Sequence, residues 1–341
     1  MFYKNLESLE KISKEFINKG IYIVPILIFH ELFRYSYPIE PYANFRHDNP
    51  KLFLENLSSK LLNFAQSADC LTLYNLNDIN NHKKEINNLP QETSKLYISQ
   101  WKKFGREELL NEAKKLLLNR IPQSIFDEFI QNKNVLDFGC GSGRYSLALK
   151  LLGAKKVTAL DYNIESAKDS IEISKNLKLD IEFLNGDIPN LNVDSLGNFD
   201  FIFSNGVLHH TYDWRKSLDQ YLKLIKKAGY LYLYANHGYF WNIRKVARKV
   251  FSKIPKDVTQ EVLDNIGLPR NRFIFMDTFY VPVEAHIDRK DLLDILKEND
   301  FKYKQLISKN EFDILGEFAL SLPDFYEVFG EAEHRYLVQR N

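Results

Sequence analysis

The sequence predicts an α/β protein in which helices wind around a mostly parallel β-sheet, and three observations support this prediction. Five short apolar runs alternate with helical segments between residues 134 and 234. A glycine-rich turn follows the first of these runs and precedes a helical segment. The residues before about position 90 show helical periodicity without strand-turn-strand order, so we expect a mainly helical N-terminal extension.

The N-terminal extension contains two helix candidates. Apolar residues recur at helical spacing from Leu6 to Phe16, with Gly20 placed to end that helix, and again from Leu54 to Phe64. The segment 35–50 is rich in aromatic residues and proline and is predicted to be extended. The asparagine-rich segment 75–91 is interpreted as a loop or linker.

The pattern becomes helical again from residue 91 to about residue 130, and the sheet follows. The five strand candidates are Asn134–Phe138, Lys156–Leu160, Ile181–Asn185, Phe199–Ser204 and Tyr230–Tyr234. Beyond them we expect, in order, a basic helix at 239–253, a loop through Pro282, a helix at 288–298 and two strands at 303–308 and 336–339. The predicted domains are therefore 1–90 and 91–341, the second with helices at 91–130 and a C-terminal β-hairpin region at 300–341.

Composition limits the class of protein and its partners. Lys and Arg number 46 against 45 for Asp and Glu, so no global field attracts nucleic acid or a membrane surface. The only cysteines are Cys70 and Cys140, and a disulfide at Cys140 would obstruct the glycine-rich turn, which favours a reducing, cytoplasmic location. The apolar stretch 21–29 is interrupted by Pro25 and is shorter than the roughly 20 residues of a spanning helix, so no transmembrane segment is expected.

The glycine-rich turn predicts a ligand site. Its glycines are Gly139, Gly141 and Gly143, whereas a dinucleotide fingerprint would place its third glycine at Arg144. Asp137 stands at the end of the preceding strand, where a carboxylate suits a ligand with an ammonium or sulfonium charge and would repel a pyrophosphate. These residues favour a cationic cofactor over NAD. The alternative is a tight turn whose aspartate only caps the helix.

Two further acids follow the next two strands. Asp161 ends the second strand, about twenty residues beyond the glycines, where a carboxylate can accept both hydroxyls of a ribose. Asp187 follows the third strand in Gly186-Asp187-Ile188, and we interpret it either as a group that recognises an adenine edge or as an ordinary turn residue. The pattern therefore predicts a nucleoside ligand.

These motifs resemble those of class I methyltransferases that use S-adenosylmethionine. The resemblance rests on Val135–Gly143, Asp161, Asn185–Asp187 and Phe199–His210, and it extends from about residue 91 to the C-terminus. It is strongest to the small-molecule and quinone-type subgroup with a Val-Leu-His-His segment. One departure is Lys226–Tyr230, where the family usually has a Pro-Gly-Gly turn.

The resemblance implies a Rossmann-like sheet of seven strands, mostly parallel with an antiparallel last strand. It also implies S-adenosylmethionine as the cofactor. The implied cofactor-binding residues are Asp137, Gly139, Cys140, Gly141, Gly143, Asp161, Tyr162, Gly186, Asp187, Ile188, Asn205, Tyr97 and Trp101. Tyr97 and Trp101 would belong to lid helices within 91–130, although the same aromatic segment also fits an amphipathic helix that packs its apolar side. No metal is expected, since Ser204-Asn205 offers no acidic ligand after the fourth strand.

Methyl transfer to an oxygen or a nitrogen requires removal of a proton, and the loops after the fourth and fifth strands offer candidates for a general base. We take His210, His237 and Tyr212 as the catalytic candidates, since histidine titrates near neutral pH. Each histidine is equally consistent with a structural role.

The predicted function is transfer of a methyl group from S-adenosylmethionine to an oxygen, nitrogen or carbon atom of a small metabolite, such as a sugar or a lipid-linked intermediate. One alternative is an RNA methyltransferase that docks through the basic helix 239–253, although the near-zero net charge argues against a nucleic-acid partner. Another is a protein that binds the cofactor without catalysis. The sequence leaves the acceptor, the oligomeric state and the role of residues 1–90 open.

Overall fold

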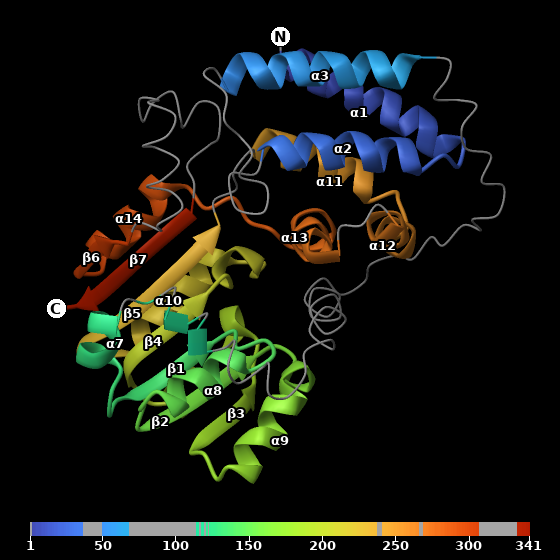
Figure 1. Cartoon of the computed structure of the whole chain (residues 1–341). Helices are drawn as coiled ribbons and strands as arrows, with labels where there is room; N and C mark the ends of the chain where they lie inside the picture. The colour runs from blue at the N-terminus through green and yellow to red at the C-terminus, as the bar shows by residue number, and fades with distance from the viewer. Residues whose placement is uncertain are drawn as a thin grey trace. The chain divides into compact units, whose positions relative to one another are not determined.

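The protein is described here from a computed structural model (Figure 1). The structure describes residues 2–36, 50–67, 114–115, 117–118, 121, 123–236, 241–265, 269–306 and 333–341. The chain forms two compact units, one that contains the sheet and one whose described part is helical. The helical unit combines residues from 1–86 with residues from 238–281, and the domain boundary at residue 90 stays a prediction.

Seven strands form the sheet, in the order β3-β2-β1-β4-β5-β7-β6. They are β1 (Asn134–Phe138), β2 (Lys156–Asp161), β3 (Ile181–Asn185), β4 (Phe199–Asn205), β5 (Ile225–Asn236), β6 (Phe301–Gln305) and β7 (Glu333–Arg340). The pairs from β3 to β5 are parallel, and β7 is antiparallel to both of its neighbours. The expected Rossmann-like sheet with an antiparallel last strand is therefore confirmed.

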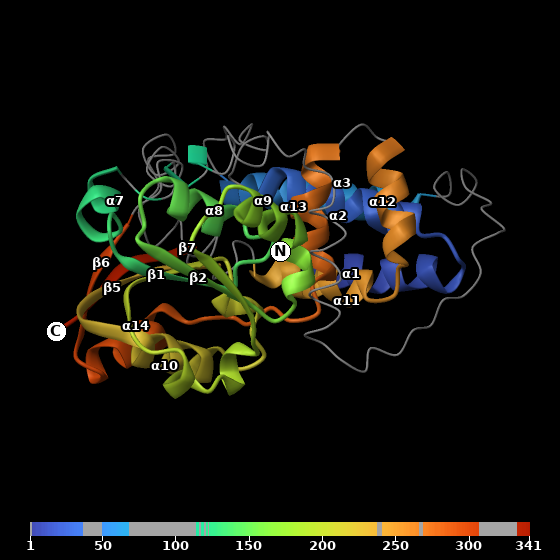
Figure 2. The same ribbon diagram turned by 90° about the horizontal axis from the view of Figure 1, so that it is seen from below.

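Helices cover both faces of this sheet (Figure 2). One face carries α7 (Gln123–Phe129), α8 (Arg144–Leu151) and α9 (Lys168–Asn176), and the other carries α10 (Trp214–Leu224) and α14 (Arg289–Glu298). The central strands are apolar along their length because both of their faces are buried. Phe203 and Tyr232 stack toward the α7 and α8 side, and Phe138 meets Tyr221 of α10 on the other side.

Short 3-10 turns connect several of these elements. They are η1 (Ile164–Ala167), η2 (Ile188–Asn190), η3 (Val193–Ser195) and η4 (Leu208–His210). η1, η2 and η4 directly follow the carboxyl ends of β2, β3 and β4. Because these ends lie along one edge of a parallel sheet, the three turns frame the region where open α/β folds bind ligands.

The described part of the helical unit consists of helices from two distant parts of the chain. They are α1 (Phe2–Asn18), α2 (Ile23–Ser36), α3 (Pro50–Gln66), α11 (Trp241–Phe251), α12 (Lys256–Asn265) and α13 (Pro269–Tyr280). Phe251 of α11 lies at the centre, with its ring 5.9 Å from that of Phe29 and 5.2 Å from that of Phe275. No helix in the described part of the chain is long and apolar enough to cross a bilayer.

One expectation about helices was wrong and one helix was not anticipated, and a proline stands at or beside the start of each helix concerned. Helix α2 begins at Ile23 and includes Pro25, which a first helical turn tolerates because its missing N–H has no helical partner there. The loop expected through Pro282 contains α12 and α13, which begin beside Pro255 and at Pro269. Pro25, Pro255 and Pro269 thus lie at or beside the starts of helices. The segment predicted to be extended, 35–50, lies mostly outside the described residues.

The segment in which the sequence departs from the usual Pro-Gly-Gly turn lies within β5, at an irregularity of its pairing with β4, and carries backbone strain. Ala228 adopts a φ of +59°, in the left-handed region that disfavours a Cβ. We expect Ala228→Gly to raise the free energy of unfolding by roughly 0.5–1 kcal/mol, because relief of strain exceeds the entropy that glycine adds to the unfolded chain.

Urea denaturation would measure this effect, with Lys227→Gly as the matched control. Lys227 is exposed and has no positive φ, so glycine there should lower stability. Equal destabilisation by both substitutions would refute the assignment of strain to Ala228.

Candidate functional site

The glycine-rich turn brings backbone to the carboxyl edge of the sheet, and its three glycines lie in different surroundings. Gly139 has a φ of +82°, and a Cβ there would lie 2.4 Å from Cγ1 of Val207. At Gly143, with a φ of +74°, a Cβ would lie 2.7 Å from Cβ of Ser170. Gly141 has a φ of +53° and no protein atom within 4 Å of the Cβ position. The turn is therefore packed at both ends and open in the middle.

Asp161 holds this turn from the neighbouring strand. Its Oδ2 accepts a hydrogen bond from the Gly141 N–H at 2.9 Å, and its Oδ1 accepts one from the Asn163 N–H at 3.0 Å. Burial raises the pKa of this carboxyl group, and the backbone hydrogen bonds oppose that shift. Asp161 thus orders the open part of the turn in addition to offering a carboxylate at the site.

Asp137 is the most deeply buried acid of the site, with an exposed fraction of 2%. Ser146 of α8 donates a hydrogen bond to its Oδ2 at 2.6 Å. Burial raises the pKa of Asp137 to about 7, the hydrogen bond from Ser146 lowers it, and the charge of Asp161 raises it further. At neutral pH this carboxyl group is therefore only partly ionised, and a cation placed beside it would favour the charged form.

The third strand contributes Asn185, Gly186, Asp187 and Ile188. The Gly186 N–H donates to the Asp161 carbonyl oxygen at 2.9 Å, which joins the ends of β2 and β3. Asp187 accepts hydrogen bonds at Oδ2 from Tyr212 and from Asn190, both at 2.9 Å. Ile188 is buried in the core below the site. Tyr162, next to Asp161, is partly exposed.

The loop after β4 is fixed by the segment that follows α13. Nδ1 of His210 lies 3.0 Å from the Val283 carbonyl oxygen, and the Ala285 N–H donates to the His209 carbonyl oxygen at 2.7 Å. His209 is buried, whereas His210 is partly exposed. Oδ1 of Asn205 is buried and has no hydrogen-bond partner in the described part of the chain. A buried acceptor of this kind is suited to a ligand that donates a hydrogen bond.

The predicted site residues within the described ranges lie at the carboxyl ends of β1 to β4 and in the turns that follow them. Tyr97, Trp101 and His237 lie outside those ranges. Tyr212 contacts Asp187, so it is placed with the predicted cofactor residues. Sequence reasoning missed Ser146 and Asn190, since a serine or an asparagine beside an aspartate gives no signal until the fold is known.

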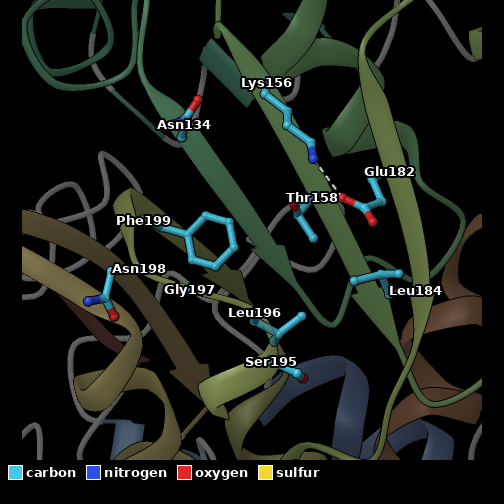
Figure 3. A pocket seen from close by; sticks show the side chains of 10 residues that line it. All are labelled: Asn134, Lys156, Thr158, Glu182, Leu184, Ser195, Leu196, Gly197, Asn198 and Phe199. Carbon is cyan, nitrogen blue, oxygen red and sulfur yellow. Dashed lines mark hydrogen bonds and ion pairs between the residues drawn. The ribbon is translucent and has the colours of Figure 1, made fainter. Parts of the chain in front are cut away.

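A hollow of about 400 Å³ lies elsewhere, at the amino end of the sheet (Figure 3). Asn134, Lys156 and Phe199, the first residues of β1, β2 and β4, line it. Lys156 pairs with Glu182 at this hollow at 2.7 Å, and both side chains are about half-exposed. Since the predicted site residues lie at the opposite ends of the strands, we do not assign this hollow to the cofactor. The described residues contain no group of three potential metal ligands, and a metal-free site stays a prediction.

Comparison with known proteins agrees with this geometry. A family model described as a methyltransferase domain matches residues 130–265. A ubiquinone biosynthesis O-methyltransferase of Pelagibacter ubique is 25% identical over 259 residues, which cover 70% of this chain and 91% of that protein. An uncharacterized protein of Methanocaldococcus jannaschii is 37% identical over 67 residues, which cover 20% of this chain and only 31% of that protein.

Among solved structures, PKMT2 from Rickettsia typhi in complex with AdoHcy has a TM-score of 0.48 and 15% identity, covering 65% of this chain and 54% of that one. The family match falls on the part of the chain that contains β1 to β5 and the glycine-rich turn. The sheet order and the motifs at its carboxyl edge agree with that match. These findings support a methyltransferase that uses S-adenosylmethionine, with the matched domain at residues 130–265.

Proposed function

We propose that this chain transfers a methyl group from S-adenosylmethionine to an oxygen, nitrogen or carbon atom of a small metabolite, such as a sugar or a lipid-linked intermediate, by direct in-line transfer. The observation that carries the proposal is Asp137, a buried carboxyl group with a pKa of about 7 beside an open glycine turn. A cationic cofactor would supply the positive charge that this group lacks. The free, buried thiol of Cys140 in the same turn fits a reducing, cytoplasmic location.

When bound, the cofactor supplies a methyl group already activated on a sulfonium. Asp137 would bind its positively charged part, Asp161 its ribose hydroxyls and Asp187 its adenine edge, while the open backbone at Gly141 allows close approach. Asn205, with its buried and unpartnered Oδ1, is available to accept a further hydrogen bond from either substrate. The protein's remaining task is to align the acceptor and to take its proton.

His210 is the general base that the geometry favours for an oxygen or nitrogen acceptor. The Val283 carbonyl oxygen can only accept a hydrogen bond, so Nδ1 of the neutral ring must carry the hydrogen. Nε2 then carries the lone pair that can take a proton. His237 remains the second candidate, and Tyr212 fits this role poorly, because it donates to Asp187 and has a pKa raised to about 12 by partial desolvation and by that carboxylate.

The acceptor class follows from two arguments. The ubiquinone biosynthesis O-methyltransferase matches 70% of this chain, whereas a ribosomal protein L11 methyltransferase of Thermosipho melanesiensis matches 30%, which favours a small acceptor with a hydroxyl group. The packing of the basic helix α11 argues against an RNA acceptor that docks on this helix. Arg244 is buried, and Arg248 donates to the carbonyl oxygens of Thr278 and Val281.

Calorimetric titration of S-adenosylmethionine and of NAD into the purified protein tests the cofactor assignment. We expect saturable binding of S-adenosylmethionine and none of NAD, with binding lost in Asp161→Ala. Binding of NAD alone would refute the proposal. Formation of S-adenosylhomocysteine with a panel of hydroxylated and amine-bearing metabolites would then separate an enzyme from a protein that only binds the cofactor.

The role of His210 makes a separate prediction. His210→Gln should lower the rate of methyl transfer to an oxygen or nitrogen acceptor by roughly 100-fold or more, the usual contribution of a general base. The dissociation constant for S-adenosylmethionine should stay within about twofold, since His210 is not assigned to the cofactor. His286→Gln, an exposed histidine on the same following segment, is the matched control. Unchanged turnover in His210→Gln would refute His210 as the general base and leave His237 as the candidate for that role.

A further inference from the structure

A network of polar side chains surrounds Asp187 and joins two parts of the site that are distant in sequence. Tyr212 and Asn190 both donate to Oδ2 of Asp187 at 2.9 Å. Nδ2 of Asn190 also lies 2.5 Å from the Tyr212 hydroxyl oxygen, and Lys216 donates to Oδ1 of Asn190 at 2.7 Å. The carboxylate at the end of β3 is thereby tied to the turn after β4 and to the first turn of α10.

The hydrogen bonds fix the orientation of each member. Lys216 can only donate, so it holds the oxygen of the Asn190 side chain and directs the amide nitrogen to Asp187. Asp213 caps α10 by accepting a hydrogen bond from the Lys216 N–H at 3.0 Å, which positions Tyr212 and Lys216 on either side of the cap. The hydroxyl of Tyr212 remains protonated across the physiological range, since its pKa is raised to about 12.

The consequence for Asp187 is chemical. Two donors on one oxygen fix the plane of the carboxylate group. The other oxygen, Oδ1, then points in a defined direction as an acceptor. A fixed acceptor distinguishes a purine with a 6-amino group, which donates, from one with a 6-oxo group, which does not.

We propose that Tyr212 and Asn190 are positioning residues that hold Asp187 as a selective acceptor for the 6-amino group of the cofactor's purine ring. The inference rests on the proposed function, because it takes the nucleoside of S-adenosylmethionine as the ligand. It assigns Tyr212 to cofactor selection and away from proton transfer, and it gives Asn190 and Lys216 a part in the site.

The test compares two ligands that differ only at the purine. Titrations of S-adenosylhomocysteine and of S-inosylhomocysteine, its 6-oxo counterpart, give the ratio of their dissociation constants. The wild type should prefer the adenosyl ligand, and Tyr212→Phe should reduce that preference by roughly tenfold, the effect of one hydrogen bond to a charged group. Asn190→Ala should act in the same direction, and the double variant should lose most of the discrimination.

A merely structural role would give a different result. Loss of packing would weaken the binding of both ligands by the same factor and lower the melting temperature. The ratio of the two dissociation constants would then not change. Tyr3→Phe, at another exposed tyrosine, is the matched control and should leave both affinities unaltered. A wild type that binds S-adenosylhomocysteine but shows no discrimination, or a Tyr212→Phe variant with an unchanged ratio, would overturn the inference alone. A wild type that does not bind S-adenosylhomocysteine would overturn the proposed function as well.

Discussion

Replacing Asp137 by asparagine should stabilise the cofactor-free protein at neutral pH and at the same time weaken its binding of S-adenosylmethionine. The pKa of Asp137 is raised from 3.8 to about 7, so the folded state holds this proton more tightly than the unfolded state does. The free energy of unfolding therefore falls as the pH rises from about 4 to about 7. At about 1.4 kcal/mol for each pKa unit, the loss is on the order of 4 kcal/mol at most.

Asparagine cannot ionise, and its oxygen can still accept the hydrogen bond from Ser146. Urea denaturation of wild type and Asp137→Asn between pH 4.5 and pH 8 should give curves that agree at the acidic end and separate toward pH 8, with the variant more stable. Calorimetry at pH 8 should show that the variant binds S-adenosylmethionine at least roughly tenfold more weakly, since a charge-assisted hydrogen bond is lost. Wild-type affinity should itself rise from pH 6 to pH 8. A variant less stable than wild type at pH 8 would contradict this account of Asp137.

The second large effect separates two glycines of the same turn. Gly139→Ala should lower the free energy of unfolding by roughly 2–5 kcal/mol, because it combines a strained φ with overpacking. The new Cβ would lie 2.4 and 2.5 Å from the two methyl carbons of Val207, a short branched side chain that cannot move far. Val207 also packs against the main core, so a displacement of its side chain would disturb the packing of that core.

Gly141→Ala should have the opposite profile. No protein atom lies within 4 Å of the new Cβ. The free energy of unfolding should therefore fall only by the strain of a φ of +53°, roughly 1 kcal/mol. The added methyl group would occupy the open part of the turn, and calorimetry should show loss of S-adenosylmethionine binding. Equal stability of the two variants, or normal binding by a folded Gly141→Ala, would be inconsistent with a turn that is packed at Gly139 and open at Gly141.

The sheet was predictable from sequence because its strands are buried on both faces. The bounds of β1 and β3 agree with the predicted Asn134–Phe138 and Ile181–Asn185, since an unbroken apolar run bounded by turn residues leaves few alternatives. The glycines and acids that follow these strands were located for the same reason. The fold of a parallel sheet then brings their carboxyl ends to a common edge without further information.

The helices were less predictable, because the meaning of a proline depends on the position of the helix around it. Pro25 and Pro269 are favourable in the first turn of α2 and α13 and would be disruptive a few residues later. The contacts between side chains were not predictable at all. Tyr212 and Asp187 are separated by 25 positions, and their hydrogen bond depends on how η2 and α10 pack.

The composition of the helical unit also has a consequence for synthesis on the ribosome. Helices α1 and α2 pack against α11, and Phe29 meets Phe251, which is made 222 residues later (251 − 29). At roughly 5–20 residues per second, the first helices wait about 10–45 s for the residues that complete their core. The whole of β1 to β5 emerges during that interval. The surface of α1 and α2 that contacts α11 therefore stays uncovered by α11 until that helix has been made.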